Sequence, residues 1–302
     1  MTDPKRSNLK RRAALVGAIR GFFAEKGYLE VETPLRLPVP LPEAHIELFA
    51  SEGWVLQPSP EACMKRLLAA GHTKIFQICK CFRKAERGRR HLPEMTLLEW
   101  YAAGETHADL MTCCETLVVR IARELGTGAT LGYQGLCIDL SPPWERLTVG
   151  EAFARFAPLP AEAAMAEGRF DEMMGLSIEP NLGRGRPVFL TEFPAEYASL
   201  ARLKAGDPAV AERFELYIGG LELCNGFSEL NDPAEQRQRF AAEQDRLRAL
   251  DRPVHPLPEK FLAALADMPA AAGNALGVDR LAMLFCDAAA IDEVVAFVPE
   301  EL

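Results

Sequence analysis

The stretch "KIFQICKCFRKAERGRRHLPEMTLLEWYA" (residues 74–102) decides the fold, because it holds two strand-like runs separated by a strongly basic segment. Residues 74–83 and 95–102 are rich in β-branched and aromatic side chains, which predicts an antiparallel hairpin with a long loop. Five Arg or Lys residues and one His fall within positions 82–91, although the whole chain carries a net charge of -9. We therefore expect a local anion-binding loop between two strands of a sheet.

The bulk composition limits the classes of protein that this chain can be. Its 302 residues are 49% hydrophobic and 25% charged, as in an ordinary globular protein. The negative net charge argues against a general nucleic-acid or membrane-surface binder. No apolar run reaches the roughly 20 residues that cross a bilayer, and the N-terminus lacks the pattern of a signal peptide. We expect a cytoplasmic protein without a membrane partner.

Helical patterns surround the hairpin. Apolar spacing predicts a helix over 8–26 that ends at Gly27, and Ser59 is placed to cap a second helix that has Pro60 in its first turn and ends at Gly71. Three further helix starts are predicted by "THAD" (106–109), "TVGE" (148–151) and "DPAE" (232–235). Hairpins mixed with helices predict an α+β fold around an antiparallel sheet, and the lack of a convincing linker predicts one domain over 1–302.

A second hairpin is predicted in "ERFELYIGGLELCNGFSEL" (212–230). A two-residue turn at the paired glycines places Tyr217 opposite Glu222 and Glu215 opposite Cys224. Glu215 and Glu222 then project from one face as diagonal neighbours, roughly 7 to 8 Å apart at Cβ. Such a pair either binds a bridging cation or lies on a solvated face, and the sequence alone leaves both open. Gly226 predicts a bulge or a close backbone approach.

The segment "AAGNALGVDRLAMLF" (271–285) predicts a strand of small residues that leads into an apolar helix. Such a strand lets a ligand lie against the backbone, and an Arg at the helix start can bind phosphate through two hydrogen bonds. Arg280 has that position. The alternative is that Arg280 pairs with Asp279 or faces water.

Three separated segments together resemble one family. "GYLEVETP" (27–34), "FRKAERGRRHLPEMTLLEWY" (82–101) and "GNALGVDRLAML" (273–284) are similar to motifs 1, 2 and 3 of the class II aminoacyl-tRNA synthetases. "SPEACMKRLLAAG" (59–71) and "EPNLGRGRPVFLTEFPAEYASLAR" (179–202) resemble the lysyl branch, and within it the truncated relatives that ligate β-lysine to a lysine of elongation factor P. The resemblance implies a class II catalytic domain, with an antiparallel sheet flanked by helices, and a homodimer with motif 1 at its interface.

The position of motif 1 favours a protein acceptor. Lysyl-tRNA synthetases carry an anticodon-binding OB domain before motif 1, whereas motif 1 begins here after 26 residues. We therefore expect no OB domain, no stable tRNA binding, and elongation factor P as the acceptor of lysine or β-lysine. The choice between the two isomers rests on the family alone. The alternatives are a stand-alone lysine-adenylating enzyme with a tRNA-like or small-molecule acceptor, and a catalytically lapsed relative that serves as a binding module.

The resemblance also implies cofactors and site residues. ATP and Mg²⁺ are expected, with Arg83 and Arg280 as the catalytic residues that neutralise the phosphates. The nucleotide is expected to contact Arg83, Glu86, His91, Glu222, Leu223, Gly277 and Arg280, and the metal is expected at Glu215 and Glu222. The amino acid is expected to contact Ser59, Glu61, Glu99, Tyr101, Asn225 and Glu229, because two ammonium groups entering a pocket need anionic partners. Glu99 and Tyr101 share a strand face, so a purely structural pair is the alternative for them.

The adenine side departs from the family pattern. Ala85 stands where the family has its adenine-binding Glu, and Glu86 can replace that Glu only if a bulge or loop intervenes. Leu92 and Met95 replace the usual Asn and the usual stacking Phe. We expect that ATP recognition is retained but weakened.

Overall fold

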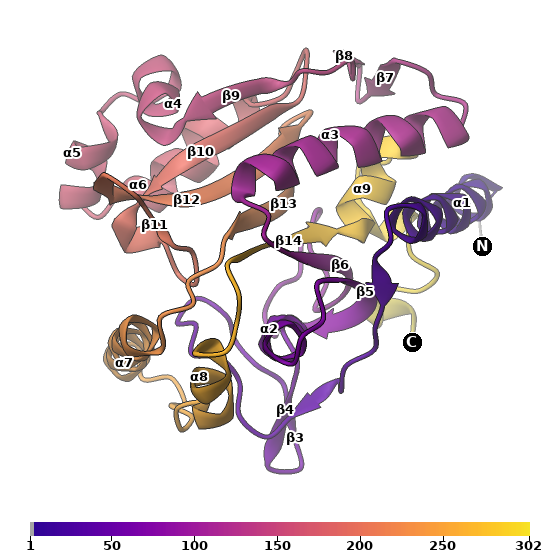
Figure 1. Cartoon of the computed structure of the whole chain (residues 1–302). Helices are drawn as coiled ribbons and strands as arrows, with labels where there is room; N and C mark the ends of the chain where they lie inside the picture. The colour runs from indigo at the N-terminus through magenta and orange to yellow at the C-terminus, as the bar shows by residue number, and fades with distance from the viewer. Residues whose placement is uncertain (1–2) are drawn as a thin grey trace.

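A nine-stranded sheet organises the computed structural model, which describes residues 3–302 (Figure 1). Two edge pairs, β1 with β5 and β9 with β10, are parallel, and the other neighbours are antiparallel. The predicted α+β fold is confirmed, although the sheet is mixed rather than wholly antiparallel. In spatial order the strands are β1 (Leu29–Glu30), β5 (Lys74–Phe82), β6 (Glu94–Ala103), β14 (Ala271–Gly277), β13 (Leu221–Ser228), β12 (Asp207–Ile218), β10 (Val188–Pro194) and β9 (Glu145–Thr148), while β11 (Leu203–Lys204) pairs with β12.

The β5–β6 hairpin is confirmed, with an unbroken register from Lys74 opposite Ala102 to Phe82 opposite Glu94. Alternation along β6 assigns its two faces. Leu98 and Trp100 lie in the main hydrophobic core, with residues of α1 (Asp3–Glu25), α3 (His107–Glu124) and α9 (Val278–Phe285). Figure 1 shows α3 lying across that face of the sheet. The next residues in alternation, Glu99 and Tyr101, therefore project from the opposite face.

The helix α1 begins at Asp3, five residues before the predicted start at residue 8. The added turn is polar, so apolar spacing could not reveal it, whereas Asp3 and Pro4 suit the first turn of a helix. Its end is as predicted, since Gly27 has a φ of 76°.

Local capping explains the starts of three other helices. Capping boxes at Thr106 and Thr148 open α3 and α4 (Val149–Phe156), and Asp232 accepts hydrogen bonds from two backbone N–H groups at the start of α7 (Pro233–Ala249). The prediction for α2 (Glu61–Ala69) was wrong by one position. Pro60 occupies the cap position, and the Ser59 hydroxyl accepts from the Glu61 N–H at 3.0 Å.

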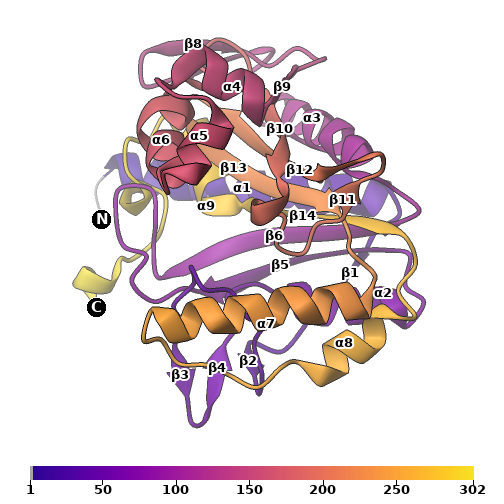
Figure 2. The ribbon, with the colours of Figure 1, turned by 90° about the vertical axis from the view of Figure 1, so that its left-hand side faces the viewer.

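Helices also cover the other face of the sheet. Figure 2 shows α7 and α8 (Glu259–Leu265) side by side, and they pack with α2 around Phe240, Phe261 and Met64. A separate cluster joins β10 to α4, α5 (Ala161–Ala166) and α6 (Phe170–Met173). The remaining strands are β2 (Arg36–Leu37), β3 (Ala50–Ser51) and β4 (Trp54–Leu56) in a small sheet, and the β7 (Thr130–Tyr133)–β8 (Leu136–Asp139) hairpin. Within residues 3–302, no helix has the length and apolarity to cross a membrane.

Candidate active site

A cavity of about 810 Å³ lies on the sheet face that carries Glu99 and Tyr101. Residues far apart in the sequence meet in it. Of the fourteen predicted site residues, Glu215 and Glu229 are buried and do not line the cavity, whereas twelve do. These twelve are Ser59, Glu61, Arg83, Glu86, His91, Glu99, Tyr101, Glu222, Leu223, Asn225, Gly277 and Arg280.

Arg280 projects into this cavity from the first turn of α9. Its Nη1 donates to the Glu222 carboxylate at 3.0 Å and to the Glu222 carbonyl at 2.8 Å, and its Nη2 contacts His91 Nε2. The alternative that Arg280 pairs with Asp279 is wrong, because Asp279 is buried and pairs with Arg12 of α1 at 2.5 Å. The two adjacent residues therefore have different partners: Asp279 binds Arg12 of α1, and Arg280 binds Glu222 in the cavity.

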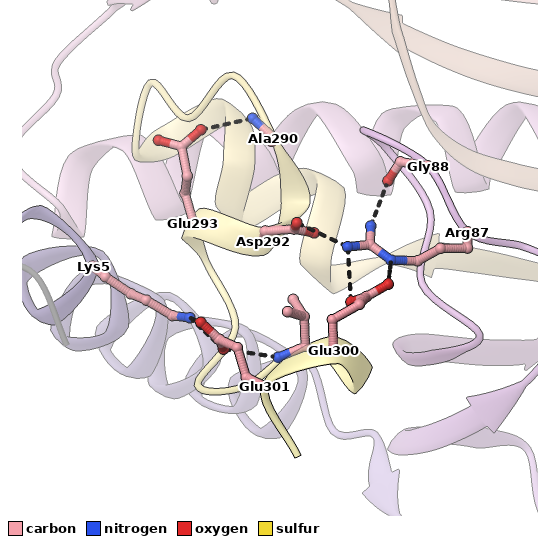
Figure 3. A network of polar contacts seen from close by, with 9 residues as sticks. Lys5, Arg87, Gly88, Ala290, Asp292, Glu293, Glu300 and Glu301 are labelled. Carbon is pink, nitrogen blue, oxygen red and sulfur yellow. Dashed lines mark hydrogen bonds and ion pairs between the residues drawn. The ribbon is translucent and has the colours of Figure 1, made fainter.

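The basic loop after β5 contributes only part of its charge to the cavity. Arg83, Arg90 and His91 line it. Arg87 instead pairs with Asp292 and Glu300 of the C-terminal segment, each at 2.9 Å (Figure 3). The loop therefore has two sets of cations, one turned to the cavity and one that ties the loop to the C-terminus.

A turn in this loop provides the break in the strand that Glu86 needs if it is to take the place of the family's adenine-binding Glu. The strand β5 ends at Phe82, and Ala85 has a φ of 64°, in the left-handed region. Glu86 lines the cavity beyond that turn, with an oxygen 3.6 Å from an Arg83 guanidinium nitrogen. Leu92 and Met95 also line the cavity, so two of the three departures from the family pattern lie in its wall, and the third, Ala85, lies in the turn next to Glu86.

The register of the β12–β13 hairpin is partly as predicted. Tyr217 lies opposite Glu222, but Glu215 lies opposite Asn225, not Cys224. The difference arises because Leu223 is an extra, bulged residue in β13 between the Tyr217–Glu222 and Leu216–Cys224 pairs. The bulge turns Asn225 to the face of Glu222, where it lines the cavity, and a two-residue turn count could not reveal it.

Gly226 has a regular partner rather than a bulge. It lies opposite Phe214 and Asn274, and a Cβ at this position would lie 2.7 Å from Phe214 Cζ and 2.8 Å from Asn274 Oδ1. Of the two predicted reasons for this glycine, the close approach is therefore confirmed and the bulge is wrong.

The two hairpin carboxylates share a face but differ in access. Glu215 is 8% exposed, so the solvated alternative is wrong for it. Its two oxygens accept hydrogen bonds from Arg213 and from the Tyr217 hydroxyl, each at 2.6 Å. Burial raises the pKa of Glu215 to about 7, although Arg213 opposes the shift. Only Glu222 presents its carboxylate to the cavity.

Glu99 and Tyr101 form a buried pair in the wall of the cavity. The Tyr101 hydroxyl donates to Glu99 Oε2 at 2.9 Å, whereas Glu99 Oε1 has no hydrogen-bond partner within residues 3–302. Burial and the neighbouring Glu61 raise the pKa of Glu99 to about 8. The pair is therefore structurally joined and still has an unused buried acceptor, which suits a cationic ligand.

Four residues of the site were missed by the sequence analysis. Lys65 lies 2.5 Å from Glu61 and 2.6 Å from Glu229, and the four-residue spacing from Glu61 on one helix could have revealed the first contact. Arg213, also missed, forms an ion pair with Glu215. Glu43, whose pKa burial raises to about 7, comes from a proline-rich stretch without a clear pattern. Gly273 lies in the small-residue strand that the sequence predicted beside a ligand but was not singled out, although a Cβ there would lie 2.3 Å from Tyr101 Cε1.

Comparison with known proteins identifies the family of this chain. Residues 1–301 match the family model of class II tRNA synthetases (D, K and N). The chain is 41% identical to an elongation factor P–(R)-β-lysine ligase of Edwardsiella ictaluri, across 96% of this chain and 94% of the relative. It is 40% identical to the ligase of that name from Vibrio cholerae, across 96% and 95%.

A second kind of relative is a tRNA ligase. A lysine–tRNA ligase of Anaeromyxobacter sp. (strain K) is 36% identical, and the match covers 98% of this chain and 66% of that relative. The sheet, the three motif segments and these matches agree with one another. The chain belongs to the class II tRNA synthetase family of the D, K and N type.

Proposed function

We propose that this protein is an ATP-dependent, AMP-forming ligase that activates a lysine-type amino acid and transfers it to a lysine side chain of elongation factor P. One observation carries the proposal: a single cavity is lined both by the cations Arg83 and Arg280 and by the buried carboxylate Glu99. Such a cavity complements a triphosphate and an ammonium-bearing amino acid together. The relatives in Edwardsiella and Vibrio support β-lysine as the substrate.

In the first step, an oxygen of the amino-acid carboxylate attacks the α-phosphorus of ATP, and the bond to the β-phosphate oxygen breaks to release pyrophosphate. The protein's part is to position two anions against each other and to offset their repulsion. Arg83 is placed for the carboxylate and α-phosphate, while Arg280 and His91 are placed for the outer phosphates. Asn225, on the Glu222 face, orients the carboxylate end.

In the second step, the neutral ε-amine of the acceptor lysine attacks the carbonyl carbon of the aminoacyl adenylate. AMP leaves, the amine loses a proton, and an amide forms. Glu61, Glu99 and Tyr101 line the site that holds the ammonium groups of the substrate meanwhile, with Glu229 directly behind the wall.

Mg²⁺ fits the phosphate end. Its usual setting in proteins is one or two carboxylates plus phosphate oxygens and water, and Glu222 offers such a carboxylate in the cavity. Glu215 is the second candidate on the same face, behind Arg213 and Tyr217. When bound, the cation would neutralise phosphate charge. On this proposal, Glu222→Gln raises the Mg²⁺ concentration needed for half-maximal pyrophosphate exchange, and Arg66→Met, on exposed surface, leaves it unchanged.

We also propose a homodimer built on the motif 1 region, with the chain acting as one catalytic domain. Large apolar side chains are exposed there: Leu29 on the edge strand β1 at 51%, Trp54 of β4 at 46%, and Leu35 at 43%. Light scattering should give twice the mass of the chain, and Leu29→Asp should shift it toward the monomer. A monomeric wild-type protein would contradict the proposal.

The decisive experiment is intact-mass analysis of elongation factor P after incubation with this protein, ATP and each lysine isomer. The expected result is one added aminoacyl group on the factor. Exchange of pyrophosphate without transfer would favour a lysine-adenylating enzyme with another acceptor. Amino-acid binding without ATP turnover would instead identify a lapsed relative that serves as a binding module.

A further inference from the structure

Lys65 is a buried cation among buried carboxylates. Its side chain is 1% exposed, and its Nζ lies 2.5 Å from Glu61 Oε1 and 2.6 Å from Glu229 Oε2. The same atom lies 5.1 Å from the centroid of the Phe227 ring. Burial lowers the pKa of Lys65, but Glu229 and Glu61 together raise it by more, so the net shift is upward. The side chain is therefore an ammonium at neutral pH.

The contacts of Lys65 use one oxygen of each carboxylate. Within residues 3–302 neither Glu229 oxygen has a partner in hydrogen-bond geometry, and Oε1 also lacks the ion pair that Oε2 makes with Lys65. Oε1 is only 2.4 Å from where a Cβ of Gly273 would be, and Gly273 lines the cavity. A free acceptor oxygen is thus held directly behind the cavity wall, beside Tyr101.

The charges around this group match a ligand with two ammonium groups. Glu61, Lys65 and Glu229 together carry one net negative charge when ionised, and Glu99 on β6 carries another. Glu43 is also near, and both Arg83 and Lys65 lower its pKa against the effects of burial and Glu61. Without Lys65, the buried Glu229 and the part-buried Glu61 would have no cation between them, an arrangement that favours proton uptake.

We propose that Lys65 is a positioning residue of the amino-acid site: its ammonium fixes the Glu61 and Glu229 carboxylates and leaves each one oxygen for an ammonium group of a diamino-acid substrate. The inference rests on the proposed function, because it takes a diamino acid as the substrate. Lys65 does not line the cavity, so it acts through the two carboxylates rather than on the reacting atoms.

Lys65→Met tests the charge of this residue while keeping most of its volume. Calorimetry at neutral pH should show lysine and β-lysine binding weakened by at least about tenfold, with ATP binding unchanged. Arg66→Met is the matched control, since Arg66 is the next residue on α2 and is exposed. Wild-type affinity for both isomers in Lys65→Met, or tighter binding, would overturn the inference.

The pH profile separates positioning from packing. Burial raises the pKa of Glu229 to about 8, and Lys65 lowers it, so loss of Lys65 should move the acidic limb of amino-acid affinity to higher pH. Glu43, Glu61, Glu99 and Tyr101 face the same group and remain in both proteins. A packing defect alone would lower affinity by the same factor at every pH, and that result would overturn the inference.

Chemical rescue supplies a second variant. In Lys65→Ala, ethylammonium should restore diamino-acid binding, whereas ethanol, a neutral molecule of similar size, should not. Equal rescue by both, or by neither in a folded variant, would count against the positioning role. If both variants unfold, ¹⁵N NMR of the wild-type Lys65 ammonium decides: its resonance should persist in the amino-acid complex, and its displacement would overturn the inference.

Different experimental results would refute the proposed function and the inference about Lys65. Diamino-acid binding that depends on Lys65, without transfer to elongation factor P, would remove the proposed function and keep this inference. Transfer to the factor by Lys65→Met with wild-type amino-acid affinity would remove the inference and keep the function.

Discussion

Replacing Gly273 with Ala should damage the amino-acid end of the cavity and spare the phosphate end. Gly273 lies directly opposite Tyr101 in the β14–β6 ladder. A Cβ there would lie 2.3 Å from Tyr101 Cε1 and 2.4 Å from Glu229 Oε1, whereas ordinary contact begins at 3.4 Å. Tyr101 is 3% exposed and hydrogen-bonded to Glu99, so its ring has little room to move.

The size of the effect follows from this overlap. Overfilling a packed site costs about 1–3 kcal/mol, as displaced side chains or as lost stability. If Tyr101 and Glu229 absorb the strain, the Kd for the diamino acid rises by roughly five- to 150-fold. If the strand absorbs it, the thermal midpoint falls instead. Calorimetry with the amino acid and with ATP, together with thermal unfolding, measures both outcomes.

Gly277→Ala is the matched control in the same strand. A Cβ there would meet nothing closer than 3.8 Å, and the φ of Gly277 is -73°, so the fold should tolerate it. Because Gly277 lines the phosphate end, any loss should appear in ATP binding and leave amino-acid binding unchanged. A Gly273→Ala protein with both wild-type amino-acid affinity and a wild-type midpoint would refute the reasoning.

Three further predictions follow from the same geometry. Because burial raises the pKa of Glu99 to about 8 and an ammonium needs the ionised form, Glu99 alone should make diamino-acid affinity rise about fifty-fold from about pH 6 to about pH 8; Glu99→Gln should make the calorimetric profile less steep and leave the limb that Glu229 contributes. Arg280→Met should raise the KM for ATP by at least about a hundredfold in pyrophosphate exchange and leave amino-acid binding intact, since it removes a charge that faces the phosphates; an unchanged KM would contradict the placement. Asp279→Ala should instead lower the free energy of unfolding by about 3–5 kcal/mol in denaturant titration. The substitution leaves Arg12 without its carboxylate and leaves the Thr96 N–H, which donates to Asp279 at 2.7 Å, without its acceptor. A loss below about 1 kcal/mol would show that the buried pair is not needed for stability.

Much of the fold could be predicted because its signals are local. Alternation along residues 74–83 and 95–102 predicts two strands, and a two-glycine turn predicts the second hairpin. Capping boxes at Thr106 and Thr148 need residues only three positions away. The start of α1 was missed because its first turn is polar and therefore lacks the apolar spacing that predicts a helix.

The site residues could be anticipated through family motifs, but their partners could not. The motif segments brought Arg83, Glu222 and Arg280 to attention, and the sheet brings them to one cavity. Nothing near Arg280 in the sequence indicates that Glu222 is its partner, or that the adjacent Asp279 pairs with Arg12. Ion pairs between distant segments depend on the packing of strands and helices, which no local pattern encodes.

The sequence by itself determined the strands, the turns, the helix caps and the set of ionisable side chains, since each depends on neighbours within a few positions. Only the tertiary structure decided which face those side chains share. One bulged residue, Leu223, turns Asn225 into the cavity, and the packing of α2 against the sheet brings Lys65 to Glu229. The physical reason is that a strand reverses its faces with a shift of one residue, and a buried charge is set by whatever the fold brings beside it.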